Sequence, residues 1–239
     1  MSYLKLLGLA VVAAMAAMAV LGASMASASE PVSESEGGKP VTFTGMGGAS
    51  TLEVLPEGGK SRTVNCTSTK SSGEFSLAST EKFTKITFNG CTATGPFGTK
   101  VSCSSGLMGG EIFTTALKGT LVYLTAGSSE AGIDLEPESG TTIATFTCGF
   151  ESMTVTGSVI GKFTPVNTWA TAYALKFAQT GGKQEAETFL ANVGCAPVTD
   201  VLSTTGTGAE AFGPRQSGLA AEEKMTFVKQ VRMATSKCS

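Results

Sequence analysis

Short stretches in which apolar and polar residues alternate follow one another from Val41 almost to the C-terminus. Side chains at every second position share one face of a β-strand, so this spacing predicts half-buried strands. The alternating apolar sets are Leu52 and Val54; Val64 and Cys66; Ile86 and Phe88; Ala144, Phe146 and Cys148; and Met153, Val155, Gly157 and Val159. Turn-forming pairs such as Asn89-Gly90 and Gly181-Gly182 separate the stretches. We therefore expect an all-β fold, an antiparallel β-sandwich or barrel of many short strands with at most one short helix.

Two stretches near the C-terminus combine this alternation with other features. In the first, Trp169 shares a face with Tyr173, Leu175 and Phe177, which predicts that the tryptophan belongs to the core. In the second, Lys229 interrupts an apolar set, which favours an edge-strand lysine that deters aggregation over a buried lysine with a depressed pKa. The set is Met225, Phe227, Val231 and Met233.

One segment does not fit simple alternation. From Gln184 to Val193 the apolar residues recur at helical spacing, and Gly194 is a plausible helix end. A short helix and an irregular strand are both open there.

The first 28 residues have the pattern of a secretory signal peptide. Lys5 precedes an uncharged apolar run, and Ala26-Ser27-Ala28 fits the small-x-small pattern of signal peptidase. We place the cleavage between Ala28 and Ser29, with an uncleaved membrane anchor as the alternative. Residues 29–40 predict a flexible leader, and 41–239 a single all-β domain without a membrane span. The protein is expected outside the cell or on its surface.

The six cysteines support export, because an even number behind a signal peptide predicts a disulfide framework. They are Cys66, Cys91, Cys103, Cys148, Cys195 and Cys238. The preferred set joins Cys91 to Cys103 across a turn-rich loop, Cys66 to Cys148, and Cys195 to Cys238. Bonds from Cys66 to Cys91 and from Cys103 to Cys148 are the alternative. The cysteines are too far apart for zinc pairs, and no metal site is expected.

Composition narrows the function classes. The chain has 17 basic and 19 acidic residues and a formal charge of −2, which offers no basic surface for nucleic acid. It contains no histidine, which excludes Ser-His-Asp and Cys-His catalytic designs.

Two motif matches are weak. Ser79-Thr80-Glu81-Lys82 fits S-x-x-K but lacks the companion motifs of a Ser-Lys hydrolase, so we interpret it as a polar turn before a strand. The segment from Gly206 to Ala211 fits a loose dinucleotide loop, but Gly213-Pro214 prevents the long helix that such a loop needs. We interpret it as an ordinary loop, and expect no cofactor.

The absence of histidine does not exclude a glycoside hydrolase, because this class of enzyme needs only two carboxylates. The only aspartates are Asp134 and Asp200, and no sequence feature pairs acidic residues across a cleft. Trp169 and Tyr173 would suit a sugar platform, although the core interpretation is favoured.

Several motifs resemble a group of secreted proteins of unknown function, typical of high-GC soil actinobacteria with many paralogues per genome. They are Gly90-Cys91, Gly110-Glu111-Ile112, Leu117-Lys118-Gly119-Thr120-Leu121-Val122-Tyr123, Phe146-Thr147-Cys148, Gly157-Ser158-Val159-Ile160-Gly161, Thr164-Pro165-Val166-Asn167 and Gln216-Ser217-Gly218-Leu219. The resemblance covers roughly residues 45–232 and implies export and a shared all-β fold, but no activity. It also implies that Cys195 and Cys238 are an addition and pair with each other.

Together these features predict a secreted or cell-surface β-protein that is not an enzyme and that binds or coats. Its expected partners are cell-wall glycan or another secreted protein. The alternatives are a glycoside hydrolase that uses two glutamates, and an inhibitor of another secreted protein.

Overall fold

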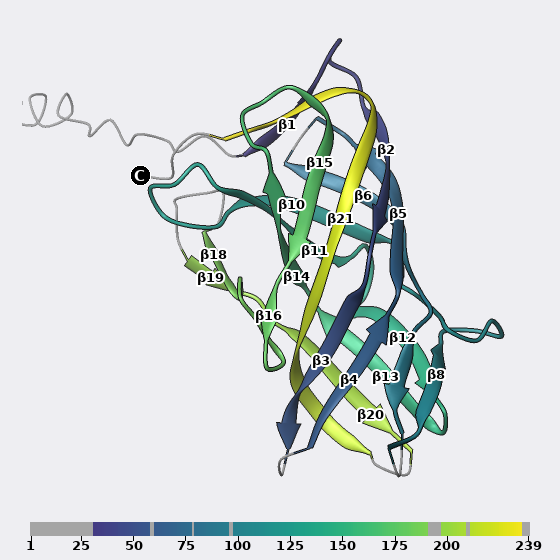
Figure 1. The fold of residues 1–239 in the computed structure, drawn as a ribbon. Coiled ribbons are helices and arrows are strands. Elements are labelled where there is room, and N and C mark those ends of the chain that lie inside the picture. The colour runs from purple at the N-terminus through teal and green to yellow at the C-terminus, as the bar shows by residue number, and fades with distance from the viewer. Residues whose placement is uncertain are drawn as a thin grey trace, which may run out of the picture.

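The computed structural model describes residues 31–57, 60–77, 79–95, 98–190, 197–208 and 211–235. These residues form antiparallel β-strands and no helix, as the alternation predicts (Figure 1). The predicted signal peptide, Cys195 and Cys238 lie outside the described residues.

Eight strands close into an antiparallel barrel, the upper part of the molecule in Figure 1. In order around the barrel they are β2 (Val41–Gly47), β5 (Ser68–Phe75), β6 (Thr80–Asn89), β10 (Leu117–Tyr123), β11 (Ala131–Pro137), β14 (Val159–Thr164), β15 (Ala170–Phe177) and β21 (Phe212–Ala234). Since β21 also pairs with β2, the sheet has no open edge here, and the predicted sandwich-or-barrel fold is a barrel.

The strand pairings below the barrel also close on themselves, in what we call the lower ring. Its members are β3 (Ser50–Glu57), β4 (Lys60–Cys66), β7 (Thr92–Thr94), β8 (Lys100–Ser104), β12 (Thr142–Cys148), β13 (Glu151–Gly157), β20 (Leu202–Thr207) and the first part of β21. The long β21 therefore belongs to both closed sheets and runs the length of the molecule (Figure 1).

The remaining strands are short additions. β1 (Val32–Ser35) pairs with the end of β21, and β9 (Glu111–Phe113) pairs with β6. A hairpin of β18 (Thr188–Leu190) and β19 (Pro197–Thr199) touches the end of β10. β16 (Gln179–Thr180) and β17 (Lys183–Gln184) form a separate two-stranded sheet.

The chain crosses between the barrel and the lower ring at short junctions. Only residues 48–49 separate β2 from β3, Thr67 separates β4 from β5, and Ser158 separates β13 from β14. At the last junction Gly157 has φ +94°, and a Cβ there would lie 2.1 Å from the Val201 carbonyl oxygen. A glycine is needed for this close approach.

A single hydrophobic cluster extends through both closed sheets. In the barrel its centre is a group of aromatic rings in mostly edge-to-face contact, with centroids 4.9–6.4 Å apart. The rings are those of Phe43, Phe75, Phe83, Phe163, Tyr173 and Phe227. They fill the barrel interior with side chains.

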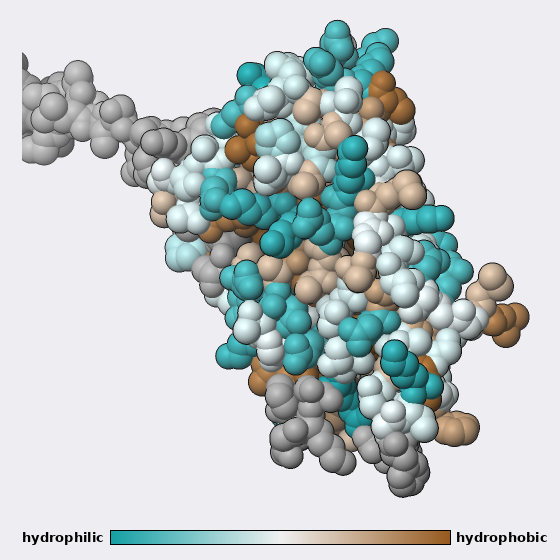
Figure 2. Space-filling view, in the orientation of Figure 1, coloured by the Kyte–Doolittle hydropathy of each residue, from teal (hydrophilic) through white to brown (hydrophobic). Residues whose placement is uncertain are grey.

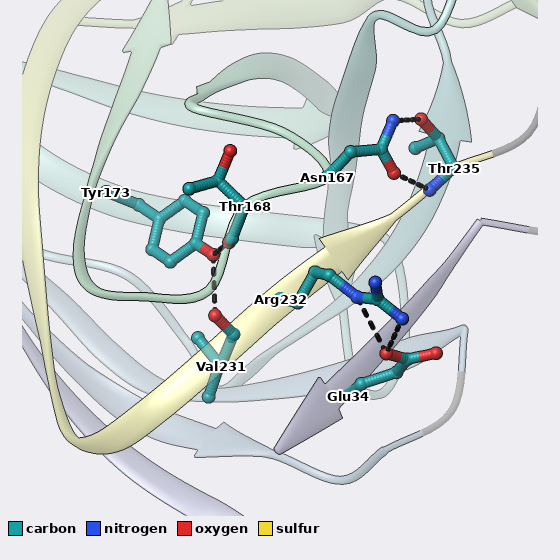
Figure 3. Close-up of polar contacts among 7 residues, drawn as sticks. All are labelled: Glu34, Asn167, Thr168, Tyr173, Val231, Arg232 and Thr235. Atoms are coloured by element: carbon teal, nitrogen blue, oxygen red, sulfur yellow. Dashed lines mark hydrogen bonds and ion pairs between the residues drawn. The ribbon is translucent and has the colours of Figure 1, made fainter. Parts of the chain in front are cut away.

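Polar contacts fasten the upper end of β21 to its neighbours (Figure 3). Arg232 binds the Glu34 carboxylate on β1, with Nε 2.8 Å from Oε2. The Asn167 side chain donates to Thr235 Oγ1 at 3.0 Å and accepts from the Thr235 amide at 2.8 Å. The Tyr173 hydroxyl lies 2.7 Å from the Val231 carbonyl oxygen.

The flexible-leader prediction is wrong for Val32–Ser35, which form β1 against β21. Ser33 and Ser35 are buried, and the Ser33 hydroxyl binds the Glu81 carboxyl group. Both buried hydroxyls have hydrogen-bond acceptors, the Glu81 carboxyl group for Ser33 and the Lys39 carbonyl oxygen for Ser35, and composition does not reveal such partners.

The core prediction for Trp169 is also wrong, because its side chain is 42% exposed and stacks against Arg232. A register shift between Ala170 and Ala172 changes which residues of the strand face inward. Tyr173 is therefore buried and Trp169 is not. Lys229 lies in an exposed stretch with Val228, where the inward alternation of β21 is interrupted.

The ambiguous segment from Gln184 forms strand rather than helix where it is described, as β17 and β18. Residues 191–193 lie outside the described part. Of the apolar residues at helical spacing, Ala186 lies in the turn after β17, and Phe189 and Leu190 lie in β18.

Two bonds of the preferred set, Cys91 to Cys103 and Cys66 to Cys148, are wrong, and the alternative is confirmed: Cys66 bonds to Cys91 and Cys103 to Cys148. Cys66, Cys103 and Cys148 lie on β4, β8 and β12, and Cys91 directly precedes β7, which pairs with β4 and β8. The Cys103 amide donates a backbone hydrogen bond to the Cys91 carbonyl at 3.0 Å, whereas the bonded pairs have Cα atoms only 4.0 and 4.1 Å apart. Such close spacing is typical of opposite residues without mutual hydrogen bonds, which favours a cross-strand disulfide.

Candidate functional site

An apolar cavity lies where the barrel meets the lower ring. Its volume is about 70 Å³, and it is lined almost entirely by apolar atoms. The barrel contributes side chains including Ile86, Leu117 and Phe177, and the lower ring contributes others including Val64, Phe146 and Val155. The cavity exceeds the roughly 10–15 Å³ that one water molecule needs, but an apolar lining does not hold water well. It suits an apolar guest.

Some lining side chains of this cavity are only partly buried. Leu52 on β3, Phe88 on β6 and Leu219 on β21 belong to the lining and to the rim of the core. Figure 2 shows apolar atoms between belts of hydrophilic side chains at mid-height of the molecule. The cavity therefore lies close to a partly exposed part of the core.

One acidic residue lines the cavity. Glu223 on β21 is 3% exposed, and its Oε2 accepts a hydrogen bond of 2.6 Å from the Ser71 hydroxyl. Its other oxygen, Oε1, is buried without a hydrogen-bond partner among the described residues. The side chain has this room because β2 carries Gly45 and Gly47 beside it. The cavity therefore combines an apolar wall with one incompletely satisfied carboxyl group.

A second buried acid lies on the outer face of the barrel. Asp134 on β11 is 5% exposed, and burial raises the pKa of its carboxyl group to about 7. The nearby Ser158 hydroxyl lowers this pKa, while the negative charges of Asp200 and Glu136 raise it further. The structure thus brings the two aspartates of the chain together, which no sequence feature indicated.

A third buried acid, Glu81, lies at the start of β6. Burial raises the pKa of its carboxyl group to about 7, against hydrogen bonds from Ser33 and Ser76 that lower it. The Ser76 amide donates to Glu81 Oε2 at 2.6 Å. Both carboxyl oxygens have partners, so this acid has a structural role in holding β1 and the turn before β6.

The sequence motifs do not form a catalytic site. Ser79 precedes β6, and Lys82 is exposed on that strand while Glu81 between them points inward. The Gly206 segment ends β20 and leads into its antiparallel partner β21, so no helix follows it. Glu151 forms an ion pair with Arg62 at 2.8 Å.

The described residues bear on three further predictions, which concern metal ligands, membrane-spanning helices and disulfides. In the described ranges, no group of three or more acidic or cysteine side chains could hold a metal ion. In the same ranges, no helix is long and apolar enough to cross a membrane. Four of the six predicted disulfide cysteines are bonded, and the other two are not described.

Exposed apolar side chains occur at loop tips of the lower half. Leu107 and Met108 lie in the loop between β8 and β9, and Phe150 lies in the turn between β12 and β13. Figure 2 shows an isolated apolar projection on this side of the molecule. Single exposed apolar residues are common on protein surfaces and do not define a binding face.

Comparisons with known proteins add no identity: no protein-family model matches the sequence, and no match was found among curated proteins or solved structures. The site must therefore be interpreted from its own chemistry. The cavity has the chemical composition of a small-ligand pocket, an apolar wall with one carboxyl group, but its volume of about 70 Å³ is well below the roughly 300–1,000 Å³ that is usual, so it admits only a very small ligand. The carboxyl pair of Asp134 and Asp200 offers a proton donor near neutral pH, but neither residue lines the cavity.

Proposed function

We propose that the protein is a secreted or cell-surface binding protein, not an enzyme, that holds a small apolar ligand between the barrel and the lower ring. The observation that carries this proposal is the apolar cavity of about 70 Å³ with a partly buried rim. Small-ligand sites are typically concave, apolar and provided with few polar groups. The signal-peptide pattern and the disulfides support the extracellular location.

The test measures thermal stabilisation of the purified protein by dissolved xenon and ethane, which are small enough for a cavity of about 70 Å³. A ligand that binds only the folded state stabilises it, by about 2.7 kcal/mol at a hundredfold excess over Kd. We expect a concentration-dependent rise in Tm for the wild-type protein. Ala144→Leu places a larger side chain at the cavity wall and should remove this rise.

The matched control is Ala116→Leu, which makes the same change at an exposed position. It should respond to both probes like the wild-type protein. The absence of a Tm rise with either probe, or an equal rise in Ala144→Leu, would count against ligand binding in the cavity.

A hydrolase is the second candidate, and one observation favours it: the buried Asp134 with its neighbour Asp200. Two carboxyl groups in different environments are a common acid–base arrangement. This pair would replace the two glutamates of the glycoside hydrolase alternative. Turnover of a polysaccharide, ester or peptide substrate that disappears in Asp134→Asn would favour this candidate over the binding protein.

A further inference from the structure

We propose that the cavity selects small organic amines, with the ammonium group at Glu223 and the apolar body against the cavity wall. This inference rests on the proposed function and names the class of its ligand. It starts from the one acidic side chain among the described residues that line the cavity.

Glu223 is placed by the local arrangement of three strands. On β21 it lies beside Gly47 of β2 and shares the inward face with Ala221 and Met225. A Cβ at Gly45 would lie 2.7 Å from Glu223 Oε2, so the glycine leaves space for the carboxylate to reach across β2 to Ser71 on β5. β2 therefore has no side chains at Gly45 and Gly47, where the Glu223 side chain passes this strand.

The polar groups at this position are incompletely satisfied. The Ser71 hydroxyl donates a hydrogen bond to Glu223 Oε2, but Oε1 has no partner among the described residues. The Thr69 hydroxyl, which lies 2.2 Å from the Cβ position at Gly47, is also buried without a partner there. A buried carboxyl oxygen without a donor costs free energy, and a ligand that supplies a donor recovers it.

Glu223 Oε1 lacks a hydrogen-bond donor, and a positively charged donor would complement the carboxylate best. No ion pair of Glu223 is found among the described residues, whereas Arg62 and Arg232 have acidic partners of their own. An ammonium group supplies donors and a charge opposite to that of the carboxylate. The apolar lining in turn requires that the rest of the ligand be a hydrocarbon.

The experiment compares three probes with the same two-carbon body, chosen for a cavity of about 70 Å³: ethylammonium, ethanol and acetate, titrated into the wild-type protein at pH 7. We expect ethylammonium to bind at least about tenfold more tightly than ethanol, as a charge-assisted hydrogen bond predicts. Acetate should bind most weakly, because its charge repels the carboxylate. This selectivity requires no variant, so it tests the inference even if substitutions at Glu223 disturb folding.

Glu223→Gln should abolish the preference for ethylammonium over ethanol. Glu222→Gln, which makes the same change at the exposed neighbour, should retain it. If ethanol binds as tightly as ethylammonium to the wild-type protein, the amine inference is overturned and the apolar binding function stands. If no probe binds, the proposed function itself has failed.

Discussion

At the residue scale, the buried acids Glu81, Asp134 and Glu223 set the chemistry of this molecule. Two of them had a signal in the sequence. Glu223 falls on the apolar face of Ala221, Met225 and Phe227, and Glu81 is two positions before Phe83. The alternation alone does not identify an acidic residue at such a position as buried. Asp134 had no such signal, because it alternates with the core residues Ile133 and Leu135 and is buried by segments distant in sequence.

The raised pKa of Asp134 predicts how stability depends on pH. The group ordinarily titrates near 3.8 but near 7 in the folded protein. Between these values the folded state keeps a proton that the unfolded state loses, so stability falls as pH rises from about 4 to about 7. The stabilisation from the proton that Asp134 retains is fully present below this pH window and lost above it.

Asp134→Asn should flatten this part of the curve and gain roughly 2 to 4 kcal/mol relative to the wild type between pH 4 and pH 8. Urea unfolding across that range measures the difference. Glu81, with a similarly raised pKa, leaves a residual slope in the variant. The control Glu138→Gln, at an exposed position, should follow the wild-type curve. An unchanged slope in Asp134→Asn would show that its carboxyl group titrates normally.

At the element scale, the alternation of apolar residues locates most strands, but it does not determine which strands are neighbours. The strands around Leu52, Val64, Ile86 and Phe146 occur as predicted. The sequence leaves the disulfide pairing open, and in the structure Cys91 neighbours both Cys66, to which it bonds, and Cys103, whose amide donates to its carbonyl. Only the hydrogen-bonding phase of the two ladders distinguishes these neighbours, and that phase depends on contacts remote in sequence.

The two disulfides lie at the shortest ladders of the lower ring. β4 pairs with β7, and β8 with β12, through two residue pairs each. We therefore expect the bond between Cys103 and Cys148 to hold the ring closed at β8. Replacing both cysteines by alanine should lower the free energy of unfolding by about 2 to 5 kcal/mol.

Denaturant unfolding of this double variant measures the loss. Mass spectrometry of non-reduced tryptic peptides should show the bond from Cys66 to Cys91 intact in the same variant. A bond from Cys91 to Cys103 in the wild-type protein would contradict the arrangement. The pairing of Cys195 with Cys238 stays a prediction, and the same peptide map tests it.

At the scale of the whole molecule, the all-β class follows from the sequence but the double closure does not. Local alternation in residues 212–234 predicts a strand, yet nothing in it shows that one strand completes two closed sheets. That role depends on partners as distant as β2 and β3. The cavity follows from the same closure, since its wall is assembled from both sheets. Export and the start of the mature chain at Ser29 stay predictions.

The shared strand predicts that the barrel and the lower ring unfold together. β21 pairs within both closed sheets, and one hydrophobic cluster extends through them, so neither can lose its strands without exposing the core of the other. Two single-tryptophan proteins test this. Trp169 reports on the barrel in the wild-type protein, and a Trp169→Phe, Phe212→Trp variant reports on the lower ring, where Phe212 lies under Arg62.

Because both proteins contain one tryptophan, each fluorescence signal has a single origin. For each protein, the fluorescence midpoint in urea should coincide with the midpoint from far-ultraviolet circular dichroism, as a cooperative transition requires. Comparison within one protein removes the effect of the substitutions on overall stability. If the lower-ring tryptophan changed at a lower urea concentration than the circular dichroism, the ring would unfold separately, and β21 would not couple the two sheets.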